Sequence, residues 1–351
     1  EGPPPAPAAS PAAPGGEKGR SFEMITVQRA VLELSNYTRL CEAMIHDGGI
    51  DLALATLQLC EAGDQRVPLA VELLWNLLAL CADAAAPIIG QRKHLDTLHA
   101  ALLCALSLGH KLNERELRND ILVVLSLLAR DEATLPHFPT ELVDLLLVLG
   151  CGAEAGKGHQ GVNPTHHATT SAEDLQMKLL SWDTLAALCR DDDTAAHVFD
   201  WGLFDVLLAY VNVDCEIPAV VSWSTLQVLD IQAHVLRLLG NLMDRGCEWF
   251  AACHGPATLR MYIDDCPKLA LRNQAVGVLA AAAATRVRGE LIGVGTIPLA
   301  IQLLDANDDL DLRIDALNLL SDSVRRDPDL QRQFLDHGGV TAVLPLLTLI
   351  P

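Results

Sequence analysis

The sequence has few aromatic residues and no apolar run long enough to cross a membrane, and each absence excludes a class of protein. Aromatic residues make up 4% of the 351 residues, and no convincing segment alternates apolar and polar positions as a half-buried β-strand does. A membrane-spanning helix needs about 20 apolar residues. The apolar runs without Lys, Arg, Asp or Glu at residues 97–110 and 337–351 are both shorter. The sequence therefore predicts an all-α chain with no membrane partner.

Cysteine pairs of the kind that bind zinc are also missing. The ten cysteines are scattered, and none belongs to a CxxC motif. Several stand inside apolar helical stretches, namely Cys60, Cys81, Cys104 and Cys189. This distribution is typical of buried, reduced thiols in a cytosolic protein.

Basic residues are scarce in comparison with acidic ones. The chain has 25 Lys and Arg against 45 Asp and Glu, which gives a formal charge of −20. Such a charge disfavours binding to the phosphate backbone of nucleic acids and to anionic lipids. It also disfavours long contacts with acidic proteins. We therefore expect no nucleic-acid partner, and a charged protein partner should be basic.

What the chain does contain is an amphipathic helix pattern, clearest at residues 113–130. Its apolar residues are spaced i, i+4, i+7, i+8 and i+11, at Leu117, Ile121, Val124, Leu125 and Leu128. This spacing predicts one stripe of a helix, and 18 helical residues would span about 27 Å. A helix with so much apolar surface cannot stand alone, so we expect it to be the inner helix of a stack.

The pattern returns along the chain, which indicates a repeat architecture. Similar helical stretches occur at residues 71–80, 175–190, 229–244, 269–284 and 310–324. A second element consists of a glycine, an aliphatic residue and a leucine-rich helix. Its copies begin at Gly48, Trp201, Val294 and Gly338, each at the glycine or one residue before it. Two of its copies, at Gly295 and Gly339, are 44 residues apart, within the period of about 40–47 of armadillo and HEAT repeats. The predicted fold is an α-solenoid of armadillo/HEAT-like helical repeats.

The composition predicts where this repeat domain begins and is interrupted. Residues 1–20 are rich in proline and alanine and read as an extended linker. Residues 21–351 form the predicted repeat domain, with a flexible insertion at about residues 150–172. The chain opens at Glu1 and closes on LPLLTLIP, which resembles a helix cut short. We expect it to be part of a longer polypeptide.

No motif in the chain predicts catalysis or metal binding. Gly156-Lys157 lacks the first glycine and the final Ser or Thr of a phosphate loop, and residues 305–316 lack the glycine and glutamate of a calcium loop. The insertion holds three histidines and a cysteine that could bind a metal: His159, His166, His167 and Cys151. Incidental histidines in a loop are the favoured interpretation. We therefore predict no enzyme, no metal site and no cofactor.

The remaining candidate site is the exposed side of the inner helices. Its predicted partner-binding residues are amides and arginines, namely Asn76, Asn119, Arg130, Arg237, Asn241, Asn273, Asn318 and Arg325. The predicted packing side carries Leu73, Leu125, Leu236 and Leu279. Arginine and asparagine side chains suit backbone carbonyls and carboxylates of a partner segment. Asn76, Asn241 and Asn318 could equally bond to the neighbouring repeat. No tryptophan stands four residues before an asparagine, which argues against a nuclear-localisation receptor.

An ordered set of segments within residues 67–267 carries a family resemblance. The segments are VELLWNLL, RELRNDILVVLSLLAR, EDLQMKLLSWDTLAALCRD, VLLAYV, DIQAHVLRLL and FAACHGPATLRMYIDDCP. In this order and spacing the chain resembles the cilia- and flagella-associated protein 69 family, armadillo-type proteins of the motile axoneme. The alanine-rich composition would suit a green-alga homologue.

The resemblance implies a structural scaffold of the ciliary central apparatus, on a projection of the C1 microtubule of the central pair, which supports ciliary motility. Partners would be other projection proteins, such as relatives of sperm flagellar protein 2. The acidic charge argues against extensive direct contact with tubulin, which is itself acidic. The alternative is a cytosolic armadillo-type adaptor that binds peptide segments of its partners in a concave groove.

Overall fold

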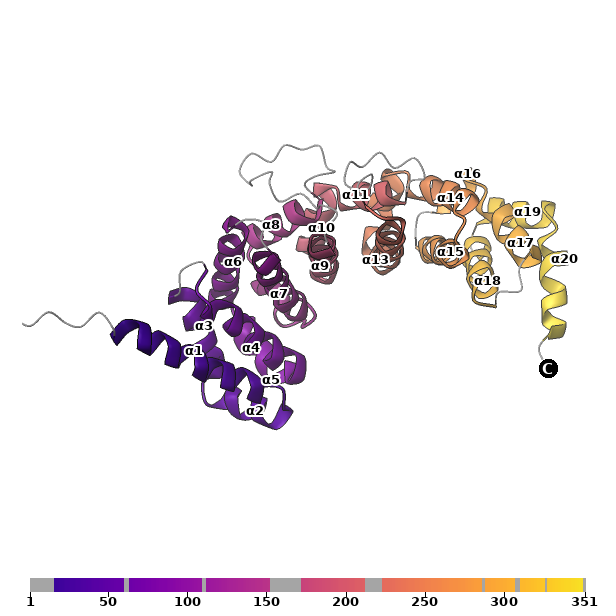
Figure 1. Ribbon diagram of the computed structural model, residues 1–351. Coiled ribbons are helices and arrows are strands. Elements are labelled where there is room, and N and C mark those ends of the chain that lie inside the picture. The colour runs from indigo at the N-terminus through magenta and orange to yellow at the C-terminus, as the bar shows by residue number, and fades with distance from the viewer. Residues whose placement is uncertain are drawn as a thin grey trace, which may run out of the picture. The chain divides into compact units, whose positions relative to one another are not determined.

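The computed structural model describes residues 16–59, 63–108, 112–151, 172–211, 223–285, 288–306, 310–325 and 327–349. Every regular element in these ranges is a helix, so the predicted all-α class is confirmed (Figure 1). None of the described helices is long and apolar enough to cross a membrane. The chain divides into two compact units, Glu1–Gly109 and His110–Pro351, which are described separately.

Unit 1 is built around a central helix. Its helices are α1 (Gly16–Leu34), α2 (Thr38–His46), α3 (Gly49–Leu59), α4 (Arg66–Leu80), α5 (Ala82–Ile89) and α6 (Arg92–Ser107). Helix α4 packs against α1, α2, α3 and α5, and its Leu74 and Leu77 are fully buried. Helix α1 begins at Gly16, so the predicted linker of residues 1–20 ends several residues too late. No proline occurs between Pro14 and Pro68, and Glu17, Lys18 and Arg20 favour a helix, although Gly19 does not.

Unit 2 contains the longer series of helices. They are α7 (Leu112–Leu128), η1 (Leu135–His137), α8 (Thr140–Cys151), α9 (Ala172–Leu188), α10 (Asp192–Trp201), α11 (Leu203–Tyr210), α13 (Thr225–Ala252), α14 (Gly255–Asp265), α15 (Leu269–Ala284), α16 (Arg288–Gly293), α17 (Thr296–Ala306), α18 (Leu310–Val324), α19 (Pro328–Asp336), α20 (Gly339–Val343) and η3 (Leu344–Leu349). Helix α8 continues through Cys151 and α9 begins at Ala172, so nearly all of the insertion predicted at about residues 150–172 lies outside the described residues.

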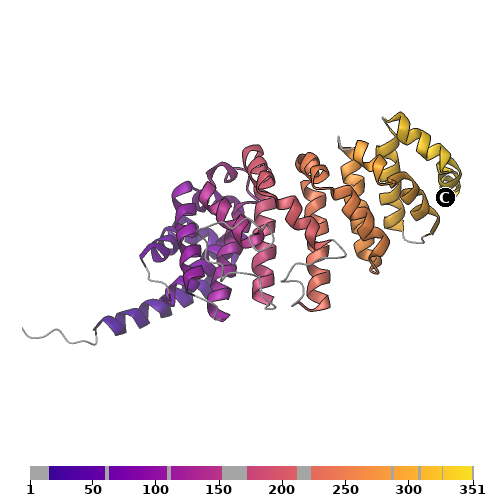
Figure 2. The same cartoon turned by 90° about the horizontal axis from the view of Figure 1, so that it is seen from above.

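The helices of unit 2 form two layers. Helices α7, α9, α13, α15 and α18 pack each against the next and form what we call the inner row. Helices α8, α11, α14 and α17 cover it: α8 packs against α9, α11 against α13, α14 against both α13 and α15, and α17 against α18. Figure 1 shows α9, α13, α15 and α18 as one row beneath α11, α14 and α17, and Figure 2 shows the same helices from above. This is the two-layer packing of a helical-repeat protein.

The leucine stripes of the inner helices form the core between these layers. In α7, Ile121, Val124, Leu125 and Leu128 are fully buried, as the spacing of residues 113–130 predicts. The four predicted packing leucines are buried too: Leu73, Leu125, Leu236 and Leu279. Burying one such side chain contributes about 1.5–3 kcal/mol, so the stripes rather than helix propensity hold the repeats together.

The recurring glycine marks a turn between two consecutive helices. Gly48, Gly202, Gly295 and Gly338 have φ values of 86°, 104°, 68° and 74°. An L side chain is strained in this left-handed region, whereas glycine is not. The helix that follows each of them begins at the next residue, as the predicted glycine-led element requires.

The buried thiols predict a reactivity pattern. Burial raises the pKa of the Cys189 thiol from its ordinary value of 9.0 to about 12, whereas Cys104 is exposed. Because the thiolate is the reactive form, iodoacetamide at mildly alkaline pH should alkylate Cys104 and spare Cys189 until urea is added. The folded pKa is the higher one, so the stability that this thiol contributes is kept below about pH 9 and falls as pH rises toward 12. Equal labelling of both thiols, measured by peptide mass spectrometry, would contradict this packing.

Candidate functional site

The structure places the eight predicted partner-binding residues in three different environments. Five are exposed: Arg130, Arg237, Asn241, Asn318 and Arg325. Asn76 and Asn273 are half-buried, and Asn119 is buried. Of the eight, Arg237 and Asn241 alone line the groove described below. Whether the exposed side chains bind a partner remains a prediction.

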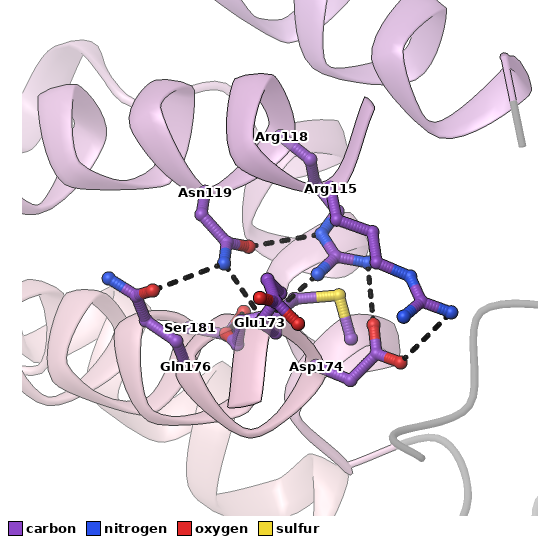
Figure 3. A network of polar contacts seen from close by, with 8 residues as sticks. Arg115, Arg118, Asn119, Glu173, Asp174, Gln176 and Ser181 are labelled. Carbon is purple, nitrogen blue, oxygen red and sulfur yellow. Dashed lines mark hydrogen bonds and ion pairs between the residues drawn. The ribbon is translucent and has the colours of Figure 1, made fainter. Parts of the chain in front are cut away.

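Asn119 belongs to a buried joint between α7 and α9 and does not face outward as predicted (Figure 3). Its amide donates to the carbonyl of Glu173 at 2.8 Å, and the neighbouring Arg118 donates to the same carbonyl at 3.0 Å. Arg118 also forms a 3.0 Å ion pair with Asp174, and these two side chains are only 5% and 4% exposed. The reason for the difference is that the first turn of α9 lies directly over this side of α7.

The joint places opposite charges where each is favoured. Asp174 is in the first turn of α9, where the helix dipole favours a carboxylate. Arg115 reaches the second oxygen of Asp174 at 3.7 Å. Burial lowers the pKa of the Arg118 guanidinium, and Asp174 opposes this shift. A buried arginine that keeps its charge beside a carboxylate fixes how these two helices meet.

Asn76 also bonds within the fold. Its amide donates to the hydroxyl of Ser35 at 2.9 Å, which ties α4 to the end of α1. For this asparagine the structure supports the second of the two roles open in the sequence, a bond to a neighbouring helix. For Asn241 and Asn318, which are exposed, the described residues provide no such bond.

The candidate site is a groove between the inner helices α13 and α15, with a volume of about 550 Å³. Its polar lining comes from one face of α13, at spacings of i, i+4, i+7 and i+11, and from α15. These residues are Asp230, His234, Arg237, Asn241 and Gln274. Its floor is made of small and apolar residues, namely Ala233, Leu236, Gly240, Gly277 and Val278. We call this feature the α13/α15 groove.

One wall of the groove is held by an ion-pair cluster. Asp183 of α9 lies 3.0 Å from Nε2 of His234 and 3.3 Å from the guanidinium of Arg237. The same guanidinium lies 2.9 Å from Nδ1 of His234. A neutral imidazole that donates from Nε2 and accepts at Nδ1 satisfies all three contacts. The positive charge of Arg237 is therefore already matched by Asp183.

The other polar groups of the groove are unused. Asp230, Asn241 and Gln274 are exposed, and none of them has a hydrogen bond or ion pair with any residue that the structure describes. An unpaired carboxylate and two unpaired amides on facing helices can accept and donate several hydrogen bonds. Sequence reasoning missed Asp230, His234, Gln274, Gly240 and Gly277. The two glycines inside helical patterns were the available signal, since such glycines are costly without a reason.

The groove offers a binding surface and no evident chemistry. Among the described residues, no cluster of His, Cys, Asp and Glu could hold a metal ion. Cys151 is buried at the end of α8. The other candidates for a metal site, His159, His166 and His167, lie outside the described residues, as does the predicted insertion around them.

Comparisons with solved structures show the fold. One engineered protein superposes with a TM-score of 0.57 at 15% identity, over 93% of this chain and 81% of its own. A second engineered protein gives a TM-score of 0.56 at 14% identity, over 79% of this chain and 97% of its own. At such identities the likeness concerns the architecture alone.

Comparisons with known sequences show the family. The mouse cilia- and flagella-associated protein 69 is 25% identical over 247 residues, which are 70% of this chain and 26% of the mouse protein. The human protein of that name is 26% identical over 198 residues, or 56% of this chain and 20% of the human protein. The chain thus spans about a fifth to a quarter of the length of these relatives. The family model for cilia- and flagella-associated protein 69, ARM repeat, matches residues 19–289. Because this match covers well over half of the sequence, the chain belongs to the cilia- and flagella-associated protein 69 armadillo-repeat family.

Proposed function

We propose that the chain is part of a structural scaffold of the ciliary central apparatus, helping to build a projection of the C1 central-pair microtubule and so supporting motility. The observation that carries the proposal is the family match over residues 19–289. The continuous core beneath the inner row supports it as well, because a scaffold must hold its binding surfaces at fixed positions.

The character of the α13/α15 groove supports binding rather than catalysis. Its free polar groups are one carboxylate and two amides, and its arginine is matched by Asp183. The partners that we propose are other projection proteins, such as relatives of sperm flagellar protein 2. The net charge of −20 favours contacts with basic segments of such proteins over long contacts with tubulin.

Cryo-electron tomography of mutant cilia tests this proposal. Disrupting the gene in a cell with motile cilia should remove density from a projection of the C1 microtubule, and the restored gene should bring the density back. Intact C1 projections in the mutant would contradict the proposal.

A salt wash distinguishes the scaffold from the alternative function, a peptide-binding adaptor. The open groove with its unused side chains is what favours a peptide-binding adaptor as the alternative. A scaffold should stay with demembranated axonemes in moderate salt, because many contacts hold it at once. An adaptor held by one exchangeable segment should be extracted.

A further inference from the structure

We infer that the α13/α15 groove binds an extended segment of a partner protein that carries an arginine or a lysine, with Asp230 as the cation-binding residue. The inference rests on the proposed function only for the partner being a ciliary protein. The chemistry of the segment comes from the groove itself.

The unpaired negative charges around the groove favour a cation on the partner. Asp230 has no ion-pair partner among the described residues. Asp244, one turn beyond Asn241 on α13, is likewise exposed and unpaired there. The one arginine of the groove is occupied by Asp183 at 3.3 Å and does not offset these charges. A guanidinium or ammonium group is the complementary partner group.

The two side-chain amides of the groove favour a partner segment with an extended backbone. Asn241 and Gln274 lie on the two facing helices, and each side chain can donate and accept. A partner helix has already paired its backbone groups internally, whereas an extended segment offers free N–H and C=O groups. From Asp230 to Asn241 the groove follows α13 for 11 residues, or about 16 Å. About five extended residues would fill that length.

The floor of the groove lets such a backbone come close. Gly240 and Gly277 lie in the interiors of α13 and α15, and neither has a positive φ. A Cβ at Gly240 would meet Val278 at 4.0 Å, and one at Gly277 would meet Asp315 at 3.4 Å. Both are ordinary contacts, so the fold itself would accept alanine at either position. Alanine is also the better helix former, and the space above the glycines therefore suits a ligand rather than the packing of this chain.

Fluorescence anisotropy with two labelled peptides tests the inference on the purified 351-residue chain. The probe alternates alanine and arginine, and the matched control alternates alanine and glutamate. The basic probe should bind, weaken as salt is added, and bind about fivefold more weakly to Asp230→Asn. Asp265→Asn, an exposed carboxylate at the end of α14, is the matched variant and should bind as the unchanged chain does.

The double variant Gly240→Ala, Gly277→Ala provides the second measurement. It should melt at a temperature no lower than that of the unchanged chain, yet bind the basic probe at least about tenfold more weakly, because two methyl groups fill the floor. Equal binding of the acidic peptide, or equal effects of Asp230→Asn and Asp265→Asn, would overturn the inference. So would a glycine variant that binds normally. Because purified protein is used, these failures would leave the tomography result for the proposed function unaffected.

Discussion

Asp174→Ala should lower the free energy of unfolding by about 3–5 kcal/mol, the cost of leaving a buried charge without its partner. Asp174 is 4% exposed and forms a 3.0 Å ion pair with Arg118, which is 5% exposed. Without the carboxylate, the guanidinium of Arg118 keeps its hydrogen bonds to the Glu173 carbonyl and to the side-chain oxygen of Asn119, and neither acceptor carries a charge. Denaturant unfolding followed by circular dichroism measures the loss.

Two control variants show whether burial causes this loss. Asp329→Ala removes the partner of Arg332 in a pair whose side chains are 66% and 71% exposed, and it should cost less than about 1 kcal/mol. Replacing both partners, Arg118→Met with Asp174→Leu, should recover part of the loss, because the buried guanidinium of Arg118 is then gone. The recovery should be incomplete, because Arg115, whose side chain is 19% exposed, still loses Asp174. If Asp174→Ala costs no more than Asp329→Ala, the joint between α7 and α9 is not closed to water as described.

Leu236→Ala should cost about 2–5 kcal/mol, because it leaves a cavity beneath the inner row. The side chain is 1% exposed and belongs to the packed floor beneath the groove. The next residue along the helix, Arg237, is 58% exposed and faces the groove. The double variant Arg237→Ala, Asn241→Ala should therefore leave the melting temperature nearly unchanged, while the loss of the Asn241 amide should weaken assembly into the axoneme.

The two outcomes together separate packing from binding on one helix. Thermal unfolding gives the stability of both variants, and quantitative immunoblots of axonemes from rescued mutant cells give their assembly. If the double variant melts as low as Leu236→Ala, Arg237 holds repeats together through its ion pair with Asp183. If neither stability nor assembly responds to it, this part of the groove is not used.

The sequence predicted the helix stack well, because burial and turns leave local patterns. The leucine spacing of residues 113–130 and the glycines at four turns were both confirmed. The same turn occurs before α14, where His254 has a φ of 56° in place of a glycine. The pattern search missed this copy because histidine is an uncommon residue in that conformation. The spacing of the glycine-led turns is therefore irregular in the sequence around residue 254, although the structure repeats the turn there.

Side chains that bond across helices were the least predictable. Asn119 was placed outward by its position on α7, yet the first turn of α9 covers it. Lys178 reads as one polar residue in an apolar helix, but it is 1% exposed. Its ammonium donates to the carbonyl of Gly150 at 2.7 Å and lies 5.2 Å from the ring centre of Trp182. Trp182 lies one turn further along the same helix, but Gly150 is 28 residues away in sequence. No local pattern could therefore predict the bond to its carbonyl.

Carbodiimide cross-linking of intact axonemes tests the central claim most directly, because the reagent joins carboxylates to lysines in direct contact. If the α13/α15 groove holds a segment of a central-apparatus protein with a lysine on Asp230, mass spectrometry should find Asp230 linked to that lysine. Asp264 and Asp265, exposed on α14 in the covering layer, are internal references. Links from these two residues alone, or links from Asp230 to tubulin, would contradict the account.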